Sequence, residues 1–224
     1  MTTLYYTISS NNISNITNIS IESYLRFYNK NIKIYIVSPT EIENKINRTE
    51  VVYINAENII PQKYYEYGIH NICKWLKSQL PNIVDIYNFD RIIYSDSDIL
   101  YFKNINDYLD TLSDSFIHIS HEGYKIRKLK RNKVCSGFIY FNPNKFKDFY
   151  IDWSQKIENR ISSQPKLLDQ PCLQEMVDLK YCNSYNLIDK TIISQIKEFK
   201  SNCYGMHYIF KNYNDMILDY KIIS

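Results

Sequence analysis

The sequence lacks the features that would place the protein in a membrane or outside the cell. No apolar run approaches the ~18 residues of a membrane-spanning helix, and the N-terminus, MTTLYYTISS, has no basic stretch followed by an apolar core. The cysteines are odd in number and form no C-x-x-C, which argues against a disulfide framework and against structural zinc. We therefore expect reduced thiols, no transmembrane segment and a cytoplasmic protein.

The sequence also contains few glycines, and its net charge is small. The 4 glycines beside 22 tyrosines and abundant Ile, Asn and Lys indicate a low-GC genome, and a viral protein would lie in the host cytoplasm. The net charge of +3 is too small to indicate nucleic-acid binding. The basic run at residues 125–133 is interpreted as a solvated loop, and contact with an anionic acceptor or peripherally with a membrane is the alternative.

The pattern of apolar residues predicts an α/β domain. The length of 224 residues and the hydrophobic content of 45% suit one globular domain with a real core. Strands are expected at residues 4–8, 32–37, 51–54, 91–94, 116–119 and 134–143. Helices are expected at residues 21–28, 67–80, 106–112 and 146–160, and residues 9–20 are interpreted as a patch of turn and cap residues.

Residues 89–104, FDRIIYSDSDILYFKN, carry the strongest functional signal. A short apolar strand delivers Asp96 and Asp98 at its carboxyl end, which is where ligands bind in open α/β sheets. Two carboxylates one residue apart can hold one Mn²⁺ or Mg²⁺ and leave positions open for phosphate oxygens. The alternative is a solvated turn, because short D-x-D matches are common by chance.

This stretch resembles the signature of the GT-A glycosyltransferases, close to the glycogenin-like (family 8) and related nucleotide-diphospho-sugar transferases. The shared pattern is an aromatic residue, an apolar strand, D-x-D, an apolar tail and an N-I-D-x-L-like segment, here NINDYL at residues 104–109. The resemblance implies a Rossmann-like GT-A single domain, with a central mixed, mostly parallel sheet flanked by helices. Residues 1–104 would be the nucleotide-binding half and residues 105–224 the acceptor and donor-sugar half.

Residues 134–143, VCSGFIYFNP, also resemble this family, whose pattern is N-S-G, an apolar strand and N-P. Ser136 and Gly137 match and are donor-binding candidates, whereas Cys135 stands where the family has Asn and so removes one amide that would bond the donor sugar. Glycine at the start of the strand lets backbone approach a ligand closely. An ordinary strand with a glycine bulge is the alternative.

Asp169 and Gln170 match the D-Q element of the family and are the candidate catalytic residues. In the family this Asp lies by the reacting sugar, where a carboxylate can orient the acceptor or stabilise developing oxocarbenium charge. The alternative is a plain helix N-cap, a position that Asp favours.

His207 is the candidate third metal ligand, as implied by the late histidine of glycogenin-like enzymes. Neutral imidazole suits Mn²⁺. The family pattern H-x-x-G-x-x-K-P-W is only partly kept, since Gly, Pro and Trp are absent, and Lys211 is the candidate diphosphate contact. A lone histidine with a structural role is the alternative.

The resemblance also implies contacts to the rest of the donor. The end of the first strand and its loop would contact base and ribose, which assigns Thr7, Ser9 and Asn11. Ser97 joins Asp96 as a donor contact. Lys74 is the candidate basic residue for the donor phosphates or sugar, and a solvated lysine on a helix surface is the alternative.

Together these matches predict a metal-dependent hexosyltransferase. It would use Mn²⁺ or Mg²⁺ to transfer a hexose from a nucleotide-diphosphate sugar, UDP-linked, to a glycan or protein acceptor, with retention implied by the family. One alternative is a degenerate fold that binds a sugar nucleotide without turnover. Another is a phosphatase of the haloacid dehalogenase type, which Leu100 disfavours because that position is normally Thr or Val. No nucleic-acid partner is expected, and a homodimer stays open.

Overall fold

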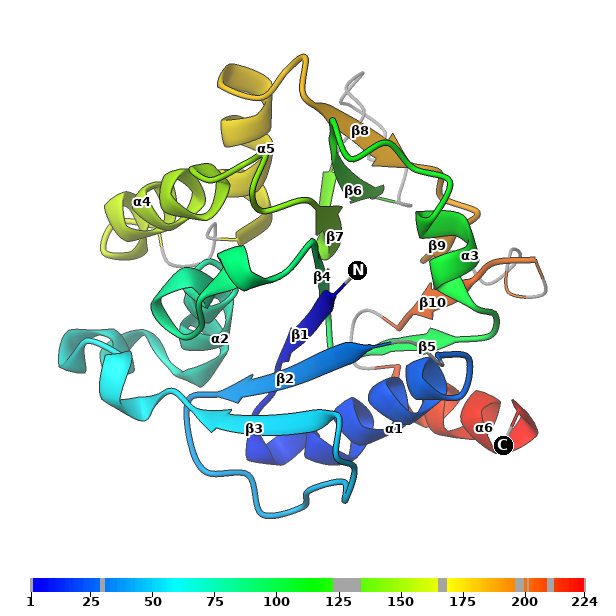
Figure 1. The fold of residues 1–224 in the computed structure, drawn as a ribbon. Coiled ribbons are helices and arrows are strands. Elements are labelled where there is room, and N and C mark those ends of the chain that lie inside the picture. Colours follow the sequence, from blue (N-terminus) through cyan, green and yellow to red (C-terminus); the bar gives the residue numbers. More distant parts are fainter. Residues whose placement is uncertain are drawn as a thin grey trace.

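A mixed sheet of seven strands forms the centre of the protein (Figure 1). The computed structural model describes residues 2–28, 31–122, 134–164, 169–195, 200, 202–208 and 212–223. In spatial order the strands are β3 (Val51–Asn55), β2 (Ile32–Ser38), β1 (Thr3–Ile8), β4 (Arg91–Ser95), β7 (Val134–Phe141), β6 (Ile117–His121) and β8 (Tyr185–Ile188).

The direction of the strands decides which residues meet at the functional edge. The pairs β3–β2, β2–β1, β1–β4 and β6–β8 are parallel, and β7 is antiparallel to both β4 and β6. The expected mixed, mostly parallel sheet is therefore confirmed. Because β7 runs against its neighbours, its first residues lie at the same edge as the carboxyl ends of β1, β4 and β6.

A small second sheet extends from this edge. It has the order β5 (Ile99–Tyr101), β10 (Gly205–His207) and β9 (Ile193–Ser194). The antiparallel pairing of β5 with β10 places His207 opposite Ile99. The late part of the chain is thereby joined to the segment that directly follows Asp98.

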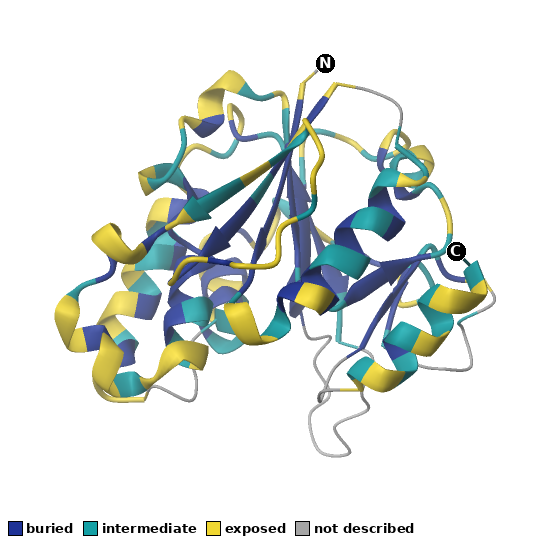
Figure 2. Cartoon of the chain, turned by 90° about the horizontal axis from the view of Figure 1, so that it is seen from below, coloured by how far each residue is buried: buried dark blue, intermediate teal, exposed yellow. Residues whose placement is uncertain are grey.

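Helices cover both faces of the large sheet (Figure 1). They are α1 (Ser14–Leu25), α2 (Ile69–Leu76), α3 (Ile105–Leu109), α4 (Phe149–Ile161) and α5 (Asp169–Leu179), whereas α6 (Tyr213–Ile223) packs against α1 and the small sheet. One core cluster packs α2, α4 and α5 against one face, and a second packs α1 and α3 against the other. The central strands are consequently buried on both sides (Figure 2), which explains why they are apolar without alternation.

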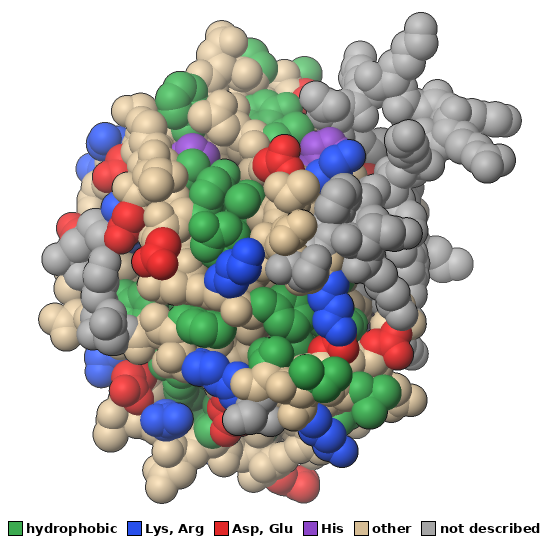
Figure 3. All heavy atoms as spheres, turned by 90° about the vertical axis from the view of Figure 1, so that its right-hand side faces the viewer, with side chains coloured by type: hydrophobic (Ala, Val, Ile, Leu, Met, Phe, Trp, Pro, Cys, Tyr) green, Lys and Arg blue, Asp and Glu red, His purple; other side chains and the backbone are tan. Residues whose placement is uncertain are grey.

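The described chain has no single-sign surface in the view of Figure 3, where basic, acidic and apolar side chains are interspersed. No helix in the described ranges is long and apolar enough to cross a membrane. The basic run at residues 125–133 lies outside the described residues, within the segment 123–133.

Helix α1 differs from expectation because it starts at Ser14, within the stretch interpreted as turns, and not at residue 21. The hydroxyl of Thr17 donates to the carbonyl of Ile13, which satisfies a polar side chain inside the helix. Ser20 and Ser23 are buried, and their small size lets α1 approach β5 closely. The expected helix at residues 67–80 is also shorter, spanning Ile69–Leu76. Strands β8, β9 and β10 and helix α6 were not expected.

We predict that Ser23→Ala destabilises the fold, because Ser23 Oγ accepts the buried N–H of Tyr101 at 3.0 Å. An unpaired buried donor should lower the free energy of unfolding by about 1–3 kcal/mol, measured by urea denaturation. Ser163→Ala is the matched control, since its hydroxyl is exposed and donates to the Arg160 carbonyl, and the change should stay within about 0.5 kcal/mol. An equal loss of stability in both variants would contradict the role of the Ser23 hydroxyl in joining α1 to β5.

Candidate active site

Three side chains at the functional edge can hold one divalent cation. His207 Nε2 lies 3.0 Å from Asp98 Oδ1 and 3.4 Å from Asp96 Oδ2. One ligand atom from each residue falls within 4.8 Å of the others. Two carboxylates with one imidazole form a donor set that suits Mn²⁺, and a hard cation such as Mg²⁺ would bind mainly through the oxygens.

Backbone bonds hold this constellation in place. Asp96 and Asp98 occupy the turn between β4 and β5, where the N–H of Asp96 donates to the carbonyl of Gly137 at 2.7 Å. On the other side, the N–H of Tyr208 donates to the Asp98 carbonyl at 2.8 Å. The acidic turn is therefore pinned both by β7 of the large sheet and by the strand that carries His207.

His207 is buried against carboxylates on one side and a thiol on the other. Burial by itself lowers the pKa of His207, but the Asp98 carboxylate outweighs burial and holds this pKa well above its usual range. Because a protonated imidazole cannot bind metal, a cation and a proton compete for Nε2. The second ring nitrogen, Nδ1, lies 3.4 Å from Gln195 Nε2 and 3.9 Å from Cys135 Sγ.

Gly137 packs closely against two of the candidate metal ligands, His207 and Asp96. The β6–β7 register shifts here, so that Ile119 pairs with Ile139 whereas Ser120 pairs with Cys135. Such a bulge redirects the strand beside a site. A Cβ on Gly137 would stand 2.5 Å from His207 Cε1 and 2.9 Å from Asp96 Oδ2. Only glycine fits this position without moving a ligand.

Lys77 forms ion pairs with both Asp96, one of the candidate metal ligands, and Asp169. Its Nζ lies 2.8 Å from both Asp96 Oδ1 and Asp169 Oδ2, and Ser136 Oγ donates to the same Asp169 oxygen at 3.0 Å. Burial disfavours the charge on Lys77, but the two carboxylates outweigh it and raise the Lys77 pKa. Burial likewise raises the pKa of Asp169, but Lys77 overcomes it and brings this pKa to about 2. Both groups are therefore charged at neutral pH.

The structure gathers most of the expected site residues at one place. Those in direct contact with one another or with Lys77 are Asp96, Asp98, Ser136, Gly137, Asp169 and His207. Lys74 is one turn before Lys77 and also lowers the Asp169 pKa, but the ion pair belongs to Lys77. Lys77 gave no signal in the sequence, because a lysine after the last turn of a helix is favoured by the helix dipole alone.

The other residues expected to bind the donor differ in burial and in hydrogen bonding. Thr7 is buried at the end of β1, and its hydroxyl has no hydrogen-bond partner in the described chain. Ser9 is buried and bonds the Thr17 hydroxyl at 2.7 Å, whereas Asn11 is exposed and accepts the N–H of Glu43. Ser97 is buried within the acidic turn.

Gln170 and Lys211 are the remaining two expected site residues. Gln170 is half-buried in the first turn of α5, where its backbone N–H bonds the Asp169 carboxylate. Asp169 is thus held by its own helix as well as by Lys77 and Ser136. Lys211 lies outside the described residues.

Two residues missed by sequence reasoning complete the surroundings of the ligands. The Tyr94 hydroxyl donates to Asp96 Oδ1, and the spacing Tyr94-x-Asp96 could have indicated this, since alternate residues of a strand share a face. The Gln195 amide donates to Cys135 Sγ at 3.0 Å, and the Gly137 N–H faces the same sulfur at 3.4 Å. No local sequence pattern indicates Gln195, because it directly follows β9 and meets Cys135 only in the folded chain.

The fold and the site together define a nucleotide-sugar transferase class of protein. The family model of the nucleotide-diphospho-sugar transferases matches residues 75–221, which is more than half of the chain and includes Lys77, Asp96, Asp169 and His207. The chain therefore belongs to the nucleotide-diphospho-sugar transferase family and is a glycosyltransferase. The expected membership of the nucleotide-diphospho-sugar transferases is confirmed. No curated protein matches the sequence.

Solved structures share the fold at low sequence identity. The galactosyltransferase LgtC, in complex with donor and acceptor sugar analogs, is 11% identical over 99% of this chain and 96% of its own, with a TM-score of 0.66. Mouse xyloside xylosyltransferase 1 is 13% identical over 94% of this chain and 98% of its own, with a TM-score of 0.63. A glycosyltransferase involved in glycosylation of the major capsid of PBCV-1 is 14% identical over 99% and 100%, with a TM-score of 0.57.

We predict that Gly137→Ala displaces His207 and Asp96 and weakens Mn²⁺ binding at least ~10-fold, because metal sites tolerate little displacement of their ligands. Titration of the protein with Mn²⁺, followed by the electron paramagnetic resonance signal of the free ion, gives the affinity.

Gly205→Ala in β10 is the control for this substitution. Its new Cβ would meet the side-chain tip of Ile193 at 3.0 Å, away from the metal ligands. This variant should bind Mn²⁺ like the wild type. Unchanged affinity in Gly137→Ala, in a protein shown to be folded by circular dichroism, would refute the close approach described above.

Proposed function

We propose that the protein is a metal-dependent hexosyltransferase that uses a UDP-linked sugar and transfers it, with retention, to a glycan or protein acceptor. The observation that carries the proposal is the contact between two groups of residues. Asp96, Asp98 and His207 can hold a divalent cation, and Lys77 links them directly to the ionised carboxylate of Asp169. Residues 1–104 would serve mainly the nucleotide, and residues 105–224 the sugar and acceptor.

The roles of the residues follow from their charges and contacts. A bound Mn²⁺ or Mg²⁺ would supply Lewis-acid stabilisation of the leaving diphosphate. Lys77 supplies a fixed positive charge in a buried place, where electrostatic stabilisation is strong and needs no reorganisation. Asp169 stays ionised beside it and can orient an acceptor hydroxyl or stabilise positive charge on the sugar ring, with Gln170 next to it.

Donor binding would use the groups that line the same edge of the sheet. Ser97, Ser136 and the backbone at Gly137 adjoin the metal ligands, and Lys211 follows His207 in sequence. Thr7, Ser9 and Asn11 at the end of β1 are proposed for base and ribose. The unpartnered, buried hydroxyl of Thr7 supports this assignment, because buried polar groups ordinarily have a partner.

Binding of a sugar nucleotide without turnover is the second candidate. It is favoured by Cys135, whose sulfur is a weak hydrogen-bonding group in the place of an amide. The amide of Gln195, in contact with that sulfur, argues for retained activity because it brings a carboxamide back to the region. Turnover of a donor panel of UDP-glucose, UDP-galactose and UDP-xylose, to water or to sugar acceptors, separates the two candidates.

We predict that UDP with Mn²⁺ raises the melting temperature of the wild type, and that Asp98→Ala loses this response. Ligand at about 100 times its dissociation constant adds ~2.7 kcal/mol, or about 5–10 °C for a domain of this size. Thermal denaturation with UDP, with Mn²⁺ and with both measures the effect.

Asp178→Ala removes an exposed carboxylate of α5 and is the control, expected to respond like the wild type. No shift in the wild type with UDP, GDP, CMP or dTDP would overturn the proposed donor site. A full shift in Asp98→Ala would overturn the assignment of Asp98 alone.

A second prediction separates the two lysines of the helix region. Lys77→Met should lower kcat for donor turnover at least ~100-fold, since it removes a fixed charge at the reacting centre. It should also lower the free energy of unfolding by about 3–5 kcal/mol, because two carboxylates lose their buried partner. Lys74→Met should change kcat less than about threefold. The reverse order of effects would restore Lys74 as the donor contact.

A further inference from the structure

The two oxygens of Asp96 face different neighbours. Oδ1 accepts from the Tyr94 hydroxyl and lies 2.8 Å from Lys77 Nζ. Oδ2 lies on the other side, 3.4 Å from His207 Nε2 and close to Gly137. One oxygen is therefore committed to protein donors, and the other is directed to the place where a metal would bind.

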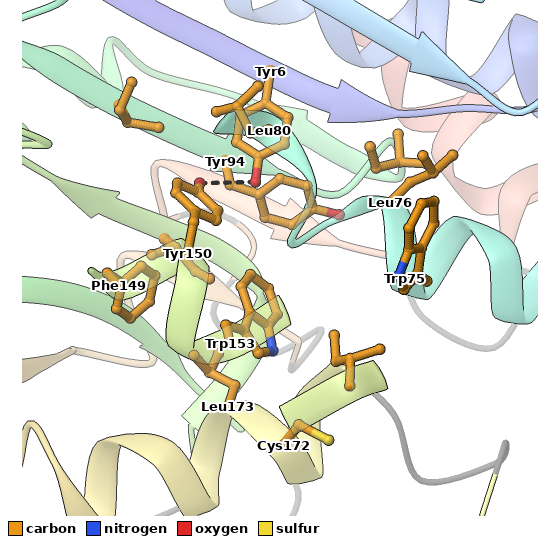
Figure 4. Packing of buried hydrophobic residues seen from close by; sticks show 14 of the residues in the cluster. Tyr6, Trp75, Leu76, Leu80, Tyr94, Phe149, Tyr150, Trp153, Cys172 and Leu173 are labelled. Atoms are coloured by element: carbon orange, nitrogen blue, oxygen red, sulfur yellow. Dashed lines mark hydrogen bonds between the residues drawn. The ribbon is translucent and has the colours of Figure 1, made fainter. Parts of the chain in front are cut away.

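Tyr94 is held rigidly enough to impose this orientation. It is 1% exposed in the middle of the sheet, and its ring lies 4.8 Å from the ring of Tyr6, centroid to centroid. Figure 4 shows Tyr94 beside Tyr6, which is itself joined to Tyr150 by a hydrogen bond of 2.8 Å. The Tyr6 hydroxyl also donates to the backbone carbonyl of Lys77 at 2.6 Å. Tyr94 and Lys77, the two donors to Oδ1, are thus both held in place by contacts with Tyr6.

Lys77 alone would not fix the carboxylate of Asp96. Its ammonium is shared with Asp169 at the same distance of 2.8 Å, and a lysine ammonium is a point charge on a flexible stem with little directional preference. The Tyr94 hydroxyl has one proton to donate, and that proton points at Oδ1. Tyr94 is the neighbour of Asp96 that defines the rotation of the carboxylate.

We propose that Tyr94 is a positioning residue for the metal, which holds Asp96 as a one-oxygen ligand through Oδ2. This inference rests on the proposed metal-dependent function and names a residue that the function did not include. With one atom offered by each of Asp96, Asp98 and His207, coordination positions on a bound cation would remain for diphosphate oxygens and water. A two-oxygen Asp96 would take one of those places.

The test is Mn²⁺ affinity in Tyr94→Phe, which keeps the packed ring and removes only the hydroxyl. Partners behind a metal ligand contribute 10–100-fold to metal affinity or activity, so we expect the dissociation constant for Mn²⁺, with UDP present, to rise by about 10–100-fold. Titration followed by the electron paramagnetic resonance signal of free Mn²⁺ measures it. Where the donor panel shows turnover, the KM for Mn²⁺ should rise in parallel while kcat at saturating Mn²⁺ recovers.

Tyr101→Phe is the matched control. This tyrosine is equally buried at the same edge, and its hydroxyl bonds Ser95 Oγ at 2.9 Å and Tyr5 at 3.4 Å. Both variants lose one buried hydroxyl and should lose similar thermal stability, but only Tyr94→Phe should lose Mn²⁺ affinity.

The outcomes separate the proposal from the function on which it rests. An affinity in Tyr94→Phe within twofold of the wild type, or an equal loss in Tyr101→Phe, overturns the role of Tyr94. Absence of Mn²⁺ binding in the wild type overturns the metal-dependent function itself. Retained binding in the wild type together with loss in Asp98→Ala keeps that function whatever Tyr94→Phe shows.

Discussion

The close approach of three carboxylates is the physical constraint on which the site depends. Asp96, Asp98 and Asp169 are ionisable groups in a partly buried region, where like charges repel strongly and water does little to screen them. Lys77 compensates two of them, and His207 faces the third. The arrangement leaves a demand for positive charge between Asp96 and Asp98, which a divalent cation can meet.

The strand order makes this approach possible. Asp96 and Asp98 follow β4, Gly137 lies in β7 and His207 ends β10, three segments that are distant in sequence. The antiparallel direction of β7 brings its amino end to the carboxyl end of β4, and the shift in register between β6 and β7 turns Gly137 toward the ligands. If β7 ran parallel to β4, its first residues, including Gly137, would lie at the opposite edge of the sheet.

Buried tyrosines give the core a second task besides packing. Tyr6, Tyr94 and Tyr150 fill the space between the sheet and helices α2 and α4, yet each hydroxyl has a partner, and two of the partners belong to the site. A phenylalanine core would pack as well, but the Lys77 backbone carbonyl would lose the Tyr6 hydroxyl and the Asp96 carboxylate would lose the Tyr94 hydroxyl. Packing and the geometry of the site are therefore coupled through the same side chains.

Local sequence determined the parts of the protein that short segments specify. The apolar run that becomes β4, the acids of the turn after it, the glycine of β7 and the Asp that opens α5 were all predictable, because burial and turn chemistry act over a few residues. The tertiary structure alone decided that Lys77 and not Lys74 reaches the carboxylates, that Gln195 meets Cys135, and that α1 begins among serines and asparagines. Each of these depends on a partner far along the chain, and no periodicity within a segment records a partner that only folding brings near.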